Sequence, residues 1–243
     1  MIPEDHPRYR SLRARERLAD CARAGIVALE GLSAHGRGEA FDYLLGEATT
    51  ASARRAEETA AAMIMTATHP VISVNGNTAA LGGGAIAALQ QASGALVEVN
   101  LFHRTEERMQ KITALLEEAG VAVLQGEAER LLPLSHDRAL CLREGIYTAD
   151  AVLVPLEDGD RCEALVAMGK RVITIDLNPL SRTAGAATLT VVDELTRALP
   201  TITAACAAMD KERAGGLMAA HDNQRLLREA LDAIQERLKH ALD

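Results

Sequence analysis

The stretch HPVISVNGNTAALGGG, from His69 to Gly84, contains the pattern that decides the fold. Its β-branched run, VISVN, predicts a short strand, and the small residues that follow open into a helical composition. Such a strand–turn–helix unit can present backbone N–H groups to an anion at the start of the helix. Asn-Gly is equally an ordinary turn, with Gly82–Gly84 as a flexible break. Both interpretations stay open at this stage.

The same alternation of strand-like and helical patterns continues along the chain. Short β-branched runs follow one another as VISVN, LVEVNLF, VAVL, AVLVP, VITIDL and TLTVV. Helical patterns separate several of them, as in residues 103–120, where Thr105 can cap a helix and Gly120 can end it. This alternation predicts βαβ units. We therefore expect an α/β fold, Rossmann-like, with a mostly parallel sheet and helices on both faces.

The two ends of the chain have helical patterns without strands. We expect a single domain, with a helical segment over residues 1–68, a core over 69–200 and a helical segment over 201–243. Ser11 is the expected N-cap of the first helix and Gly25 its end. The last helix carries one apolar seam, which packs on its own domain or forms a dimer contact; its residues are Leu227, Leu231, Ile234, Leu238 and Ala241.

Composition narrows the function classes. The formal net charge of −8 and the absence of a basic stripe argue against a nucleic-acid partner. The four cysteines are scattered, which favours reduced thiols in a cytoplasm over a zinc site or a disulfide. We find no signal-peptide pattern, no run of about 18 apolar residues, no HExxH and no Walker A motif. We therefore expect no membrane span and no metal held by protein ligands alone.

Polar side chains follow the ends of several predicted strands. The carboxyl ends of parallel strands meet at one edge of a sheet, where ligands bind. His103 and Arg104 would stand there beside the free N–H groups of a helix. An arginine is unfavourable at a helix N-terminus unless an anion is bound. The turn is therefore either an anion site or a solvated surface turn.

Two further strand ends and one glycine-rich segment contain side chains that could bind a ligand. ITIDLNPLSRTA, residues 173–184, combines a carboxylate, an amide, a guanidinium and hydroxyls. These groups could bind ribose, phosphate or Mg²⁺-phosphate. The segment could equally be a plain Asx turn with a surface arginine. LEDGDR, residues 156–161, brings Glu157, Asp158 and Asp160 together, for magnesium, an ammonium group or only a polar turn. HGRGEAFDY, residues 35–43, is expected to form a glycine-flanked, solvent-facing turn.

Six motifs together resemble one known family. IPEDHPRYRSLRARE, HGRGEAFDYLLGE, HPVISVNGNTAAL, EVNLFHRTEER, VLVPLEDGDR and DLNPLSRTA…VVDE occur in order between Ile2 and about Pro200. They resemble the archaeal phosphopantothenate synthetases, or 4-phosphopantoate–β-alanine ligases. The resemblance implies an enzyme of coenzyme A biosynthesis that joins 4-phosphopantoate to β-alanine with ATP and Mg²⁺. It further implies an acyl-adenylate intermediate, release of AMP and diphosphate, a Rossmann-like fold and a homodimer.

The resemblance also assigns residues. It places Arg15, Arg37, Asp176, Leu177, Asn178, Arg182, Thr183, Glu194 and Leu195 against ATP. Glu194 departs from the family pattern, because relatives are expected to carry Asn after Asp193. For the proton of the β-alanine amine we expect His103 or Asp158 as the acceptor. For 4-phosphopantoate we expect Asn75, Asn77 and Arg104.

Two other classes of protein fit parts of the pattern. A nicotinamide-dependent oxidoreductase would use the same fold, but GxGxxG and an acidic residue at the end of the second strand are missing. A non-catalytic nucleotide-binding dimer would bind ATP through the same turns and pair through its terminal helices.

Overall fold

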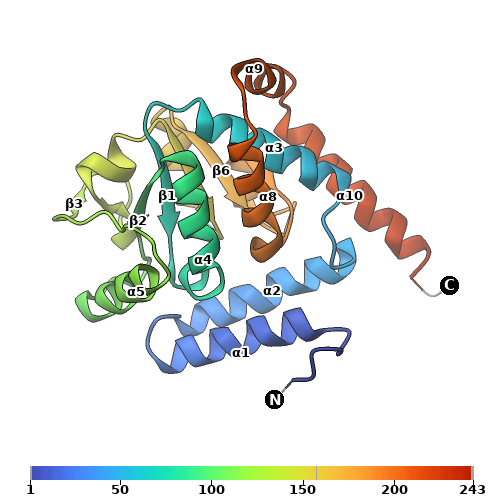
Figure 1. Ribbon diagram of the computed structural model, residues 1–243, viewed down its shortest axis with the longest axis horizontal. Coiled ribbons are helices and arrows are strands. Elements are labelled where there is room, and N and C mark those ends of the chain that lie inside the picture. The colour runs from blue at the N-terminus through green and yellow to red at the C-terminus, as the bar shows by residue number, and fades with distance from the viewer. Residues whose placement is uncertain (1, 157, 242–243) are drawn as a thin grey trace.

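The computed structural model describes residues 2–156 and 158–241 (Figure 1). The elements in chain order are α1 (Tyr9–Arg23), α2 (Leu29–Leu45), α3 (Ala51–Met65), β1 (Pro70–Val74), α4 (Gly76–Ser93), β2 (Leu96–Val99), α5 (Glu106–Glu118), β3 (Glu129–Arg130), the 3-10 helix η1 (Asp137–Ala139), β4 (Leu140–Cys141), the π-helical turn η2 (Arg143–Tyr147), β5 (Ala151–Pro155), α6 (Gly159–Ala167), β6 (Arg171–Ile175), α7 (Arg182–Ala186), β7 (Leu189–Val191), α8 (Leu195–Ala207), α9 (Lys211–Ala219) and α10 (Asn223–Lys239).

The main sheet has five strands in the order β2-β1-β5-β6-β7, and every pairing in it is parallel. Successive side chains of a strand point to opposite faces. Ile72 and Leu153 accordingly pack with residues of α3, α4 and α8 on one face. Val71 and Val152 pack with α6 and residues 131–149 on the other. Helices therefore cover both faces, and the predicted α/β class is confirmed.

Several local predictions are confirmed. Thr105 caps α5 by accepting from the N–H of Arg108, and Gly120 follows the helix with a positive φ of 88°. Gly25 stands just after α1 with φ 77°. The four cysteines are buried and free. Among the described residues, no helix is long and apolar enough to cross a membrane.

Three local predictions were wrong. Arg8, and not Ser11, is at the N-cap position of α1, with no side-chain cap there. VAVL forms only an isolated bridge between Val123 and Val97, so it is not a strand of the sheet. HGRGE is not a turn, because it lies within α2. Two glycines weaken an isolated helix, but packing of α2 against α1, α4 and α10 outweighs their low propensity.

Gly82–Gly84 do not break α4, which continues to Ser93. A Cβ added at Gly82 would come within 3.0 Å of Leu199 Cδ1 on α8, and one at Gly83 within 3.1 Å of the Cβ of Ala119. The glycines therefore let neighbouring segments approach α4 closely. The start of α4 is an ordinary Asn-Gly helix start, because Asn75 Oδ1 caps the helix by accepting from Thr78 N–H.

α1 and α2 lie side by side below the sheet in Figure 1. Arg17 Nε on α1 donates to the carbonyl of Ala80 on α4, and Asn77 Nδ2 at the start of α4 donates to the carbonyl of Gly31 on α2. These contacts hold the helix pair at the carboxyl ends of the strands. On α10, Leu227 and Ile234 of the apolar seam are buried against the same chain, whereas Leu238 is 56% exposed.

Candidate functional site

A pocket of about 900 Å³ lies between the α1–α2 pair and the carboxyl edge of the sheet. Its volume suits a nucleotide together with a small second substrate. The lining residues come from segments far apart in the sequence. They are Glu4, His6, Pro7, Arg8, Tyr9, Arg10, Ser11, Ala14, Ala34, His35, Arg37, Gly38, Glu39, Asp42, Glu47, Leu81, Phe102, Leu156, Asp158, Gly159, Asp160, Asp176, Leu177, Asn178, Ser181, Arg182, Thr183, Asp193, Glu194, Leu195, Thr196 and Arg197.

The loop after β6 forms one wall. Asp176 accepts hydrogen bonds from the N–H of Asn178 and from the hydroxyl of Ser181, so its carboxylate is fixed by its own loop. Burial raises the pKa of Asp176, and these hydrogen bonds and the charge of Arg37 offset part of the rise. Ser181 also caps the short helix α7 through the N–H of Ala184. The Asx-type turn expected as an alternative is therefore present, within the wall of the pocket.

The start of α8 forms the adjoining wall. Glu194 is its N-cap, with Oε2 accepting from the N–H and the hydroxyl of Thr196. The carboxylate is thus occupied by its own helix. Asp193 accepts from the N–H of Glu194 at 2.7 Å and from both Nε and Nη2 of Arg197, which orients the first turn of α8 at the pocket.

Arginines line the side formed by α1 and α2. Among the described residues, no acidic side chain pairs with the guanidinium groups of Arg10 and Arg37, and both residues are exposed. Arg15 does not line the pocket; its Nε donates to both oxygens of Glu39, which does. The pocket wall is acidic in total, but the two unpaired arginines in it can give charge-assisted hydrogen bonds to an anionic ligand.

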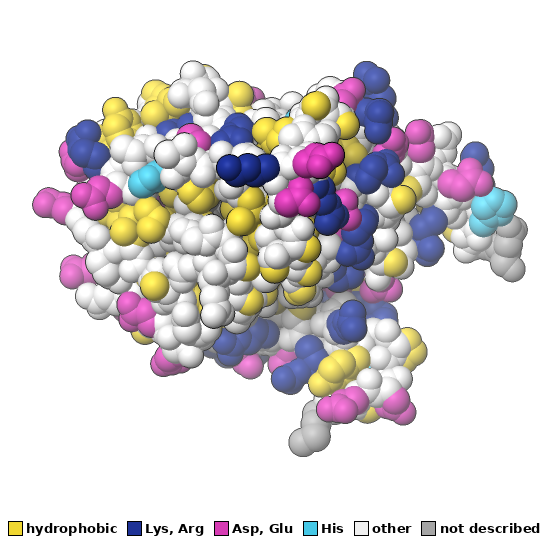
Figure 2. All heavy atoms as spheres, turned by 45° about the horizontal axis from the view of Figure 1, so that its top comes forward, with side chains coloured by type: hydrophobic (Ala, Val, Ile, Leu, Met, Phe, Trp, Pro, Cys, Tyr) yellow, Lys and Arg dark blue, Asp and Glu magenta, His cyan; other side chains and the backbone are white. Residues whose placement is uncertain are grey.

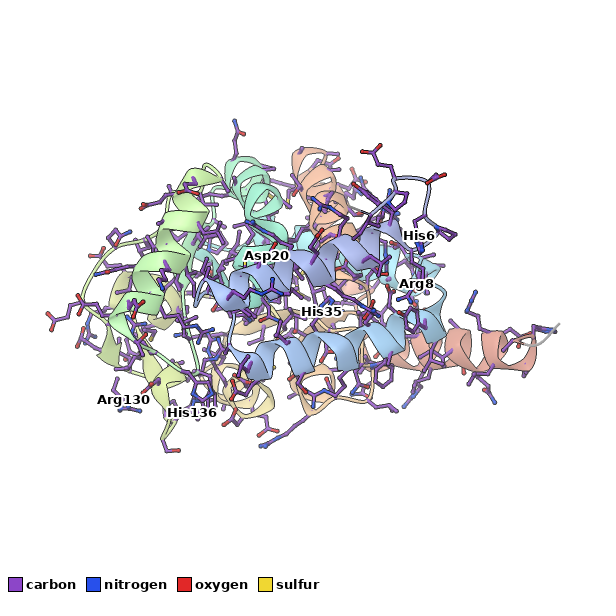
Figure 3. The ribbon with its side chains drawn as sticks, turned by 90° about the horizontal axis from the view of Figure 1, so that it is seen from below. His6, Arg8, Asp20, His35, Arg130 and His136 are labelled. Carbon is purple, nitrogen blue, oxygen red and sulfur yellow. The ribbon has the colours of Figure 1, made fainter. Side chains whose placement is uncertain are left out.

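His35 lies between α1 and α2, as Figure 3 shows, with Arg8 nearer the end of the same helix pair. Its Nε2 is buried and has no hydrogen-bond partner among the described residues. Burial lowers the pKa of His35, although the carboxylates of Glu39 and Glu194 act in the opposite direction. A neutral imidazole at this place can stack on or hydrogen-bond to an uncharged part of a ligand.

The opposite end of the pocket carries an aromatic and ionic cluster. The ring of Phe102 stacks on His136, with centroids 4.6 Å apart, and His136 Nε2 lies 2.8 Å from Asp160 Oδ2. Arg138, which is 5% exposed, donates through Nε to Asp158 Oδ2 at 2.9 Å. Asp158 is thus a pocket carboxylate held beside a buried cation.

The predicted site residues divide into two groups. Asp158 and the ATP set Arg37, Asp176, Leu177, Asn178, Arg182, Thr183, Glu194 and Leu195 all line the pocket. Asn75 and Asn77 do not, because Asn75 Nδ2 donates to the carbonyls of Pro155 and Leu156, while Asn77 holds α2. His103 and Arg104 also lie outside the lining set, although His103 contacts Phe102 with ring centroids 5.0 Å apart. Glu157 lies outside the described residues.

Sequence reasoning assigned no role to several lining residues. Arg8 and Arg10 stand in the motif IPEDHPRYRSLRARE but were given no role, and Arg197 follows the VVDE motif without being part of it. His136 and Arg138 follow no predicted strand; they do not line the pocket but contact the lining residues Phe102 and Asp158. The described residues contain no group of three or more His, Cys, Asp or Glu that could hold a metal ion.

Comparison with known proteins gives one consistent result. The family model described as Phosphopantothenate/pantothenate synthetase matches residues 52–237. A 4-phosphopantoate--beta-alanine ligase from Methanospirillum hungatei is 59% identical over 243 residues, with both chains covered in full. The enzyme of the same name from Methanosarcina mazei is 54% identical, covering 98% of this chain and 96% of its own. That of Thermococcus kodakarensis is 46% identical, covering 98% and 93%.

Proposed function

The chain belongs to the phosphopantothenate/pantothenate synthetase family, and on that premise we propose that it is a ligase joining 4-phosphopantoate to β-alanine, with ATP as the co-substrate. The observation that carries the proposal is the full-length identity of 59% to a ligase of that name. The pocket supports it, because one cavity of about 900 Å³ combines unpaired arginines with a carboxylate-lined far end.

We assign ATP to the part of the pocket formed by α2, the loop after β6 and the start of α8. Arg37 would bind a phosphate, since its guanidinium is exposed and unpaired among the described residues. Arg182 would exchange Glu163, which it binds at 2.6 and 2.5 Å, for a phosphate. Asp176 and the backbone of Asn178 and Leu195 would receive the ribose and the base. Arg15 would act through Glu39.

We assign the two acids to the end near Phe102. Asp158 lines this end, so we prefer it to His103 as the acceptor of the amine proton. Arg138 Nε donates to Asp158 Oδ2 at 2.9 Å and so orients the side chain that would accept the proton. Contacts of 4-phosphopantoate with Arg104, Asn75 and Asn77 stay predictions, and the two asparagines would act through the loops that they hold.

The chemistry needs ATP because a carboxylate does not react with an amine unaided. A carboxylate oxygen of 4-phosphopantoate attacks the α-phosphorus of ATP, and diphosphate leaves. The amine of β-alanine then attacks the acyl carbon; the C–N bond forms, the C–O bond to AMP breaks, and the amine proton passes to the base. The protein mainly aligns the reactants and neutralises charge. Mg²⁺ would bind with the phosphates of ATP and not in a cage of protein ligands.

One assay tests the function. The purified protein is mixed with Mg-ATP, 4-phosphopantoate and β-alanine. The nucleotide and acid products are then separated by chromatography and identified by mass spectrometry. AMP together with 4'-phosphopantothenate, absent when either acid is omitted, supports the ligase and the adenylate. ADP with the same product keeps the ligase and replaces the adenylate by an acyl phosphate. No amide product from a protein that binds ATP would overturn the proposal.

Neither alternative function gains support. The names of the relatives are those of ligases, which speaks against the nicotinamide-dependent oxidoreductase and the non-catalytic nucleotide-binding dimer. The homodimer and the cytoplasmic location expected from the resemblance and from the reduced cysteines stay predictions.

A further inference from the structure

Glu57, on α3, is a buried carboxyl group that the proposed reaction does not use. Its side chain is 0% exposed, and neither of its oxygens accepts a hydrogen bond from a donor among the described residues. The nearest cation is Arg54, at 3.6 Å from Oε2, but the same Arg54 nitrogen donates to Thr201 at 3.0 Å. A buried carboxylate without donors is costly, so this position calls for a different protonation state.

Helix α3 packs against α8 and β7, and Asp193 lies between those two elements, at the wall of the pocket. Its carboxyl is the neighbour with which the carboxyl of Glu57 interacts. Asp193 accepts hydrogen bonds on both of its oxygens, and Oδ2, which has one other donor in the described part of the chain, can accept a second. It receives Thr49 Oγ1 on Oδ2, and on Oδ1 it receives the N–H of Glu194 and two guanidinium nitrogens of Arg197. Two carboxyl groups can hydrogen-bond to each other only if one carries a proton, and Asp193 uses both of its oxygens as acceptors, whereas Glu57 has no donor among the described residues. The proton therefore belongs to Glu57.

A charge count agrees. Asp42 and Asp193 both pair with the guanidinium of Arg197, and in the described part of the chain Arg54, which is half exposed, is the one cation within 4 Å of Glu57. The remaining charges on α3 are bound elsewhere: Arg55 pairs with Glu229 of α10, and Glu58 pairs with Arg213 of α9. Figure 2, in which the top of the Figure 1 view comes forward, shows acidic and basic side chains mixed over the surface there.

We propose that Glu57 is a positioning residue: as a neutral carboxylic acid it donates a hydrogen bond to Asp193 and thereby fixes the first turn of α8 against the nucleotide. This rests on the proposed function, because the nucleotide is part of it. When Glu57 ionises, two carboxylates face each other and the Asp193–Arg197 geometry loosens. Burial and the charge of Asp193 raise the pKa of Glu57 from 4.5 to about 8, so the change falls on the alkaline side of neutrality.

The raised pKa of Glu57 also makes the folding stability depend on pH. The folded protein keeps this proton between the unfolded pKa of 4.5 and about pH 8, whereas the unfolded chain has lost it. The folded state therefore loses stability, relative to the unfolded chain, as pH rises through that window. Glu57→Gln keeps a neutral donor of the same shape and removes the titration.

The test uses the full chain and measures ATP affinity by calorimetry at about pH 7 and about pH 9, together with the unfolding temperature. We expect wild-type affinity to fall about fivefold between the two pH values, and Glu57→Gln to show no fall. Glu57→Ala should bind ATP about fivefold more weakly at both pH values. Glu58→Gln, which removes a charge from the neighbouring position of α3, should behave as the wild type.

An alkaline fall that persists in Glu57→Gln would overturn the proposal, and so would wild-type affinity in a folded Glu57→Ala. If Glu57→Ala does not fold, the comparison of wild type with Glu57→Gln still decides. Failure of the proposed function is seen separately, as a protein that binds ATP and forms no amide. A wild type that binds no ATP overturns both.

Discussion

Arg197 on α8 binds Asp42 on α2 through both carboxylate oxygens, at 2.5 and 3.1 Å, across 155 residues of sequence. The pair is mostly buried, with side-chain exposures of 19% and 9%. The same guanidinium holds Asp193 at 2.6 Å. A single side chain therefore joins the helix that covers the pocket to the helix whose start forms its wall.

Removing this cation should be costly for stability. Arg197→Ala leaves Asp42 and Asp193 without their shared partner, and breaking a buried pair costs about 3–5 kcal/mol. Urea unfolding of the variant measures the loss. The control is Arg182→Ala, whose partner Glu163 is exposed; we expect a loss of only about 0–1 kcal/mol there. Equal losses in the two variants would show that the Arg197 pair contributes no more than a surface ion pair.

Arg37→Ala should weaken ATP use without affecting the fold. The residue is exposed in the middle of α2, where alanine is an excellent helix former, so stability should change by less than about 0.5 kcal/mol. Loss of one charge-assisted phosphate contact should raise the KM for ATP about tenfold. Steady-state kinetics checks this, with Arg23→Ala, which lies at the end of α1 outside the pocket lining, as the control. Unchanged ATP kinetics in Arg37→Ala would contradict the assignment of ATP to this wall.

The sequence predicted the sheet and its ligand edge because both depend on local patterns. β-branched runs gave the five strands, and the rule that parallel strands end at one edge placed Asp158, Asp176 and Asn178 at the pocket. The same local reasoning failed for HGRGE, where glycine suggested a turn. Helix α2 is held by contacts with α1, α4 and α10, and such contacts leave no local signal.

The rest of the site could not be predicted from the sequence for the same reason. Arg197, Asp42 and Glu57 come from three helices. Arg197 and Glu57 have the sequence context of ordinary helical residues, and Asp42 stood in a segment that was expected to be a turn. Their relation exists only after the helices pack. Asn75 shows the opposite case: the sequence marked it correctly as the end of a strand, but its amide holds the backbone of Pro155 and Leu156 and does not face the pocket.

The glycines of α4 offer a matched pair of substitutions. Gly84 is exposed, with nothing within 4 Å of an added Cβ, so Gly84→Ala should stabilise the protein by about 0.5–1 kcal/mol through helix propensity. At Gly82 the added Cβ would lie 3.0 Å from the fully buried Leu199, so crowding should cancel or exceed that gain. Thermal unfolding compares the two variants. An equal gain at both positions would mean that α4 and α8 are less tightly packed than their contact indicates.

The two carboxyl oxygens of Glu98 accept from two different backbone donors. Oε1 accepts from the N–H of Leu142 at 3.0 Å and Oε2 from the N–H of Ile146 at 2.7 Å, with the side chain buried in β2. Burial raises the pKa of Glu98, and the two hydrogen bonds act in the opposite direction. Glu98→Gln is neutral and nearly isosteric, yet it turns an NH₂ group toward a backbone N–H. We therefore expect a loss of about 1–3 kcal/mol in urea unfolding.

The control for Glu98 is Glu129→Gln, whose partner Arg143 is exposed, and which should cost less than about 1 kcal/mol. If Glu98→Gln were instead stabilising, relief of the buried charge would outweigh the lost acceptor, and the carboxylate would be a burden on the fold. If it is destabilising as expected, the two N–H groups explain why a carboxylate stands inside a strand: it anchors residues 142–146, the segment that follows the Arg138 side of the pocket, to β2.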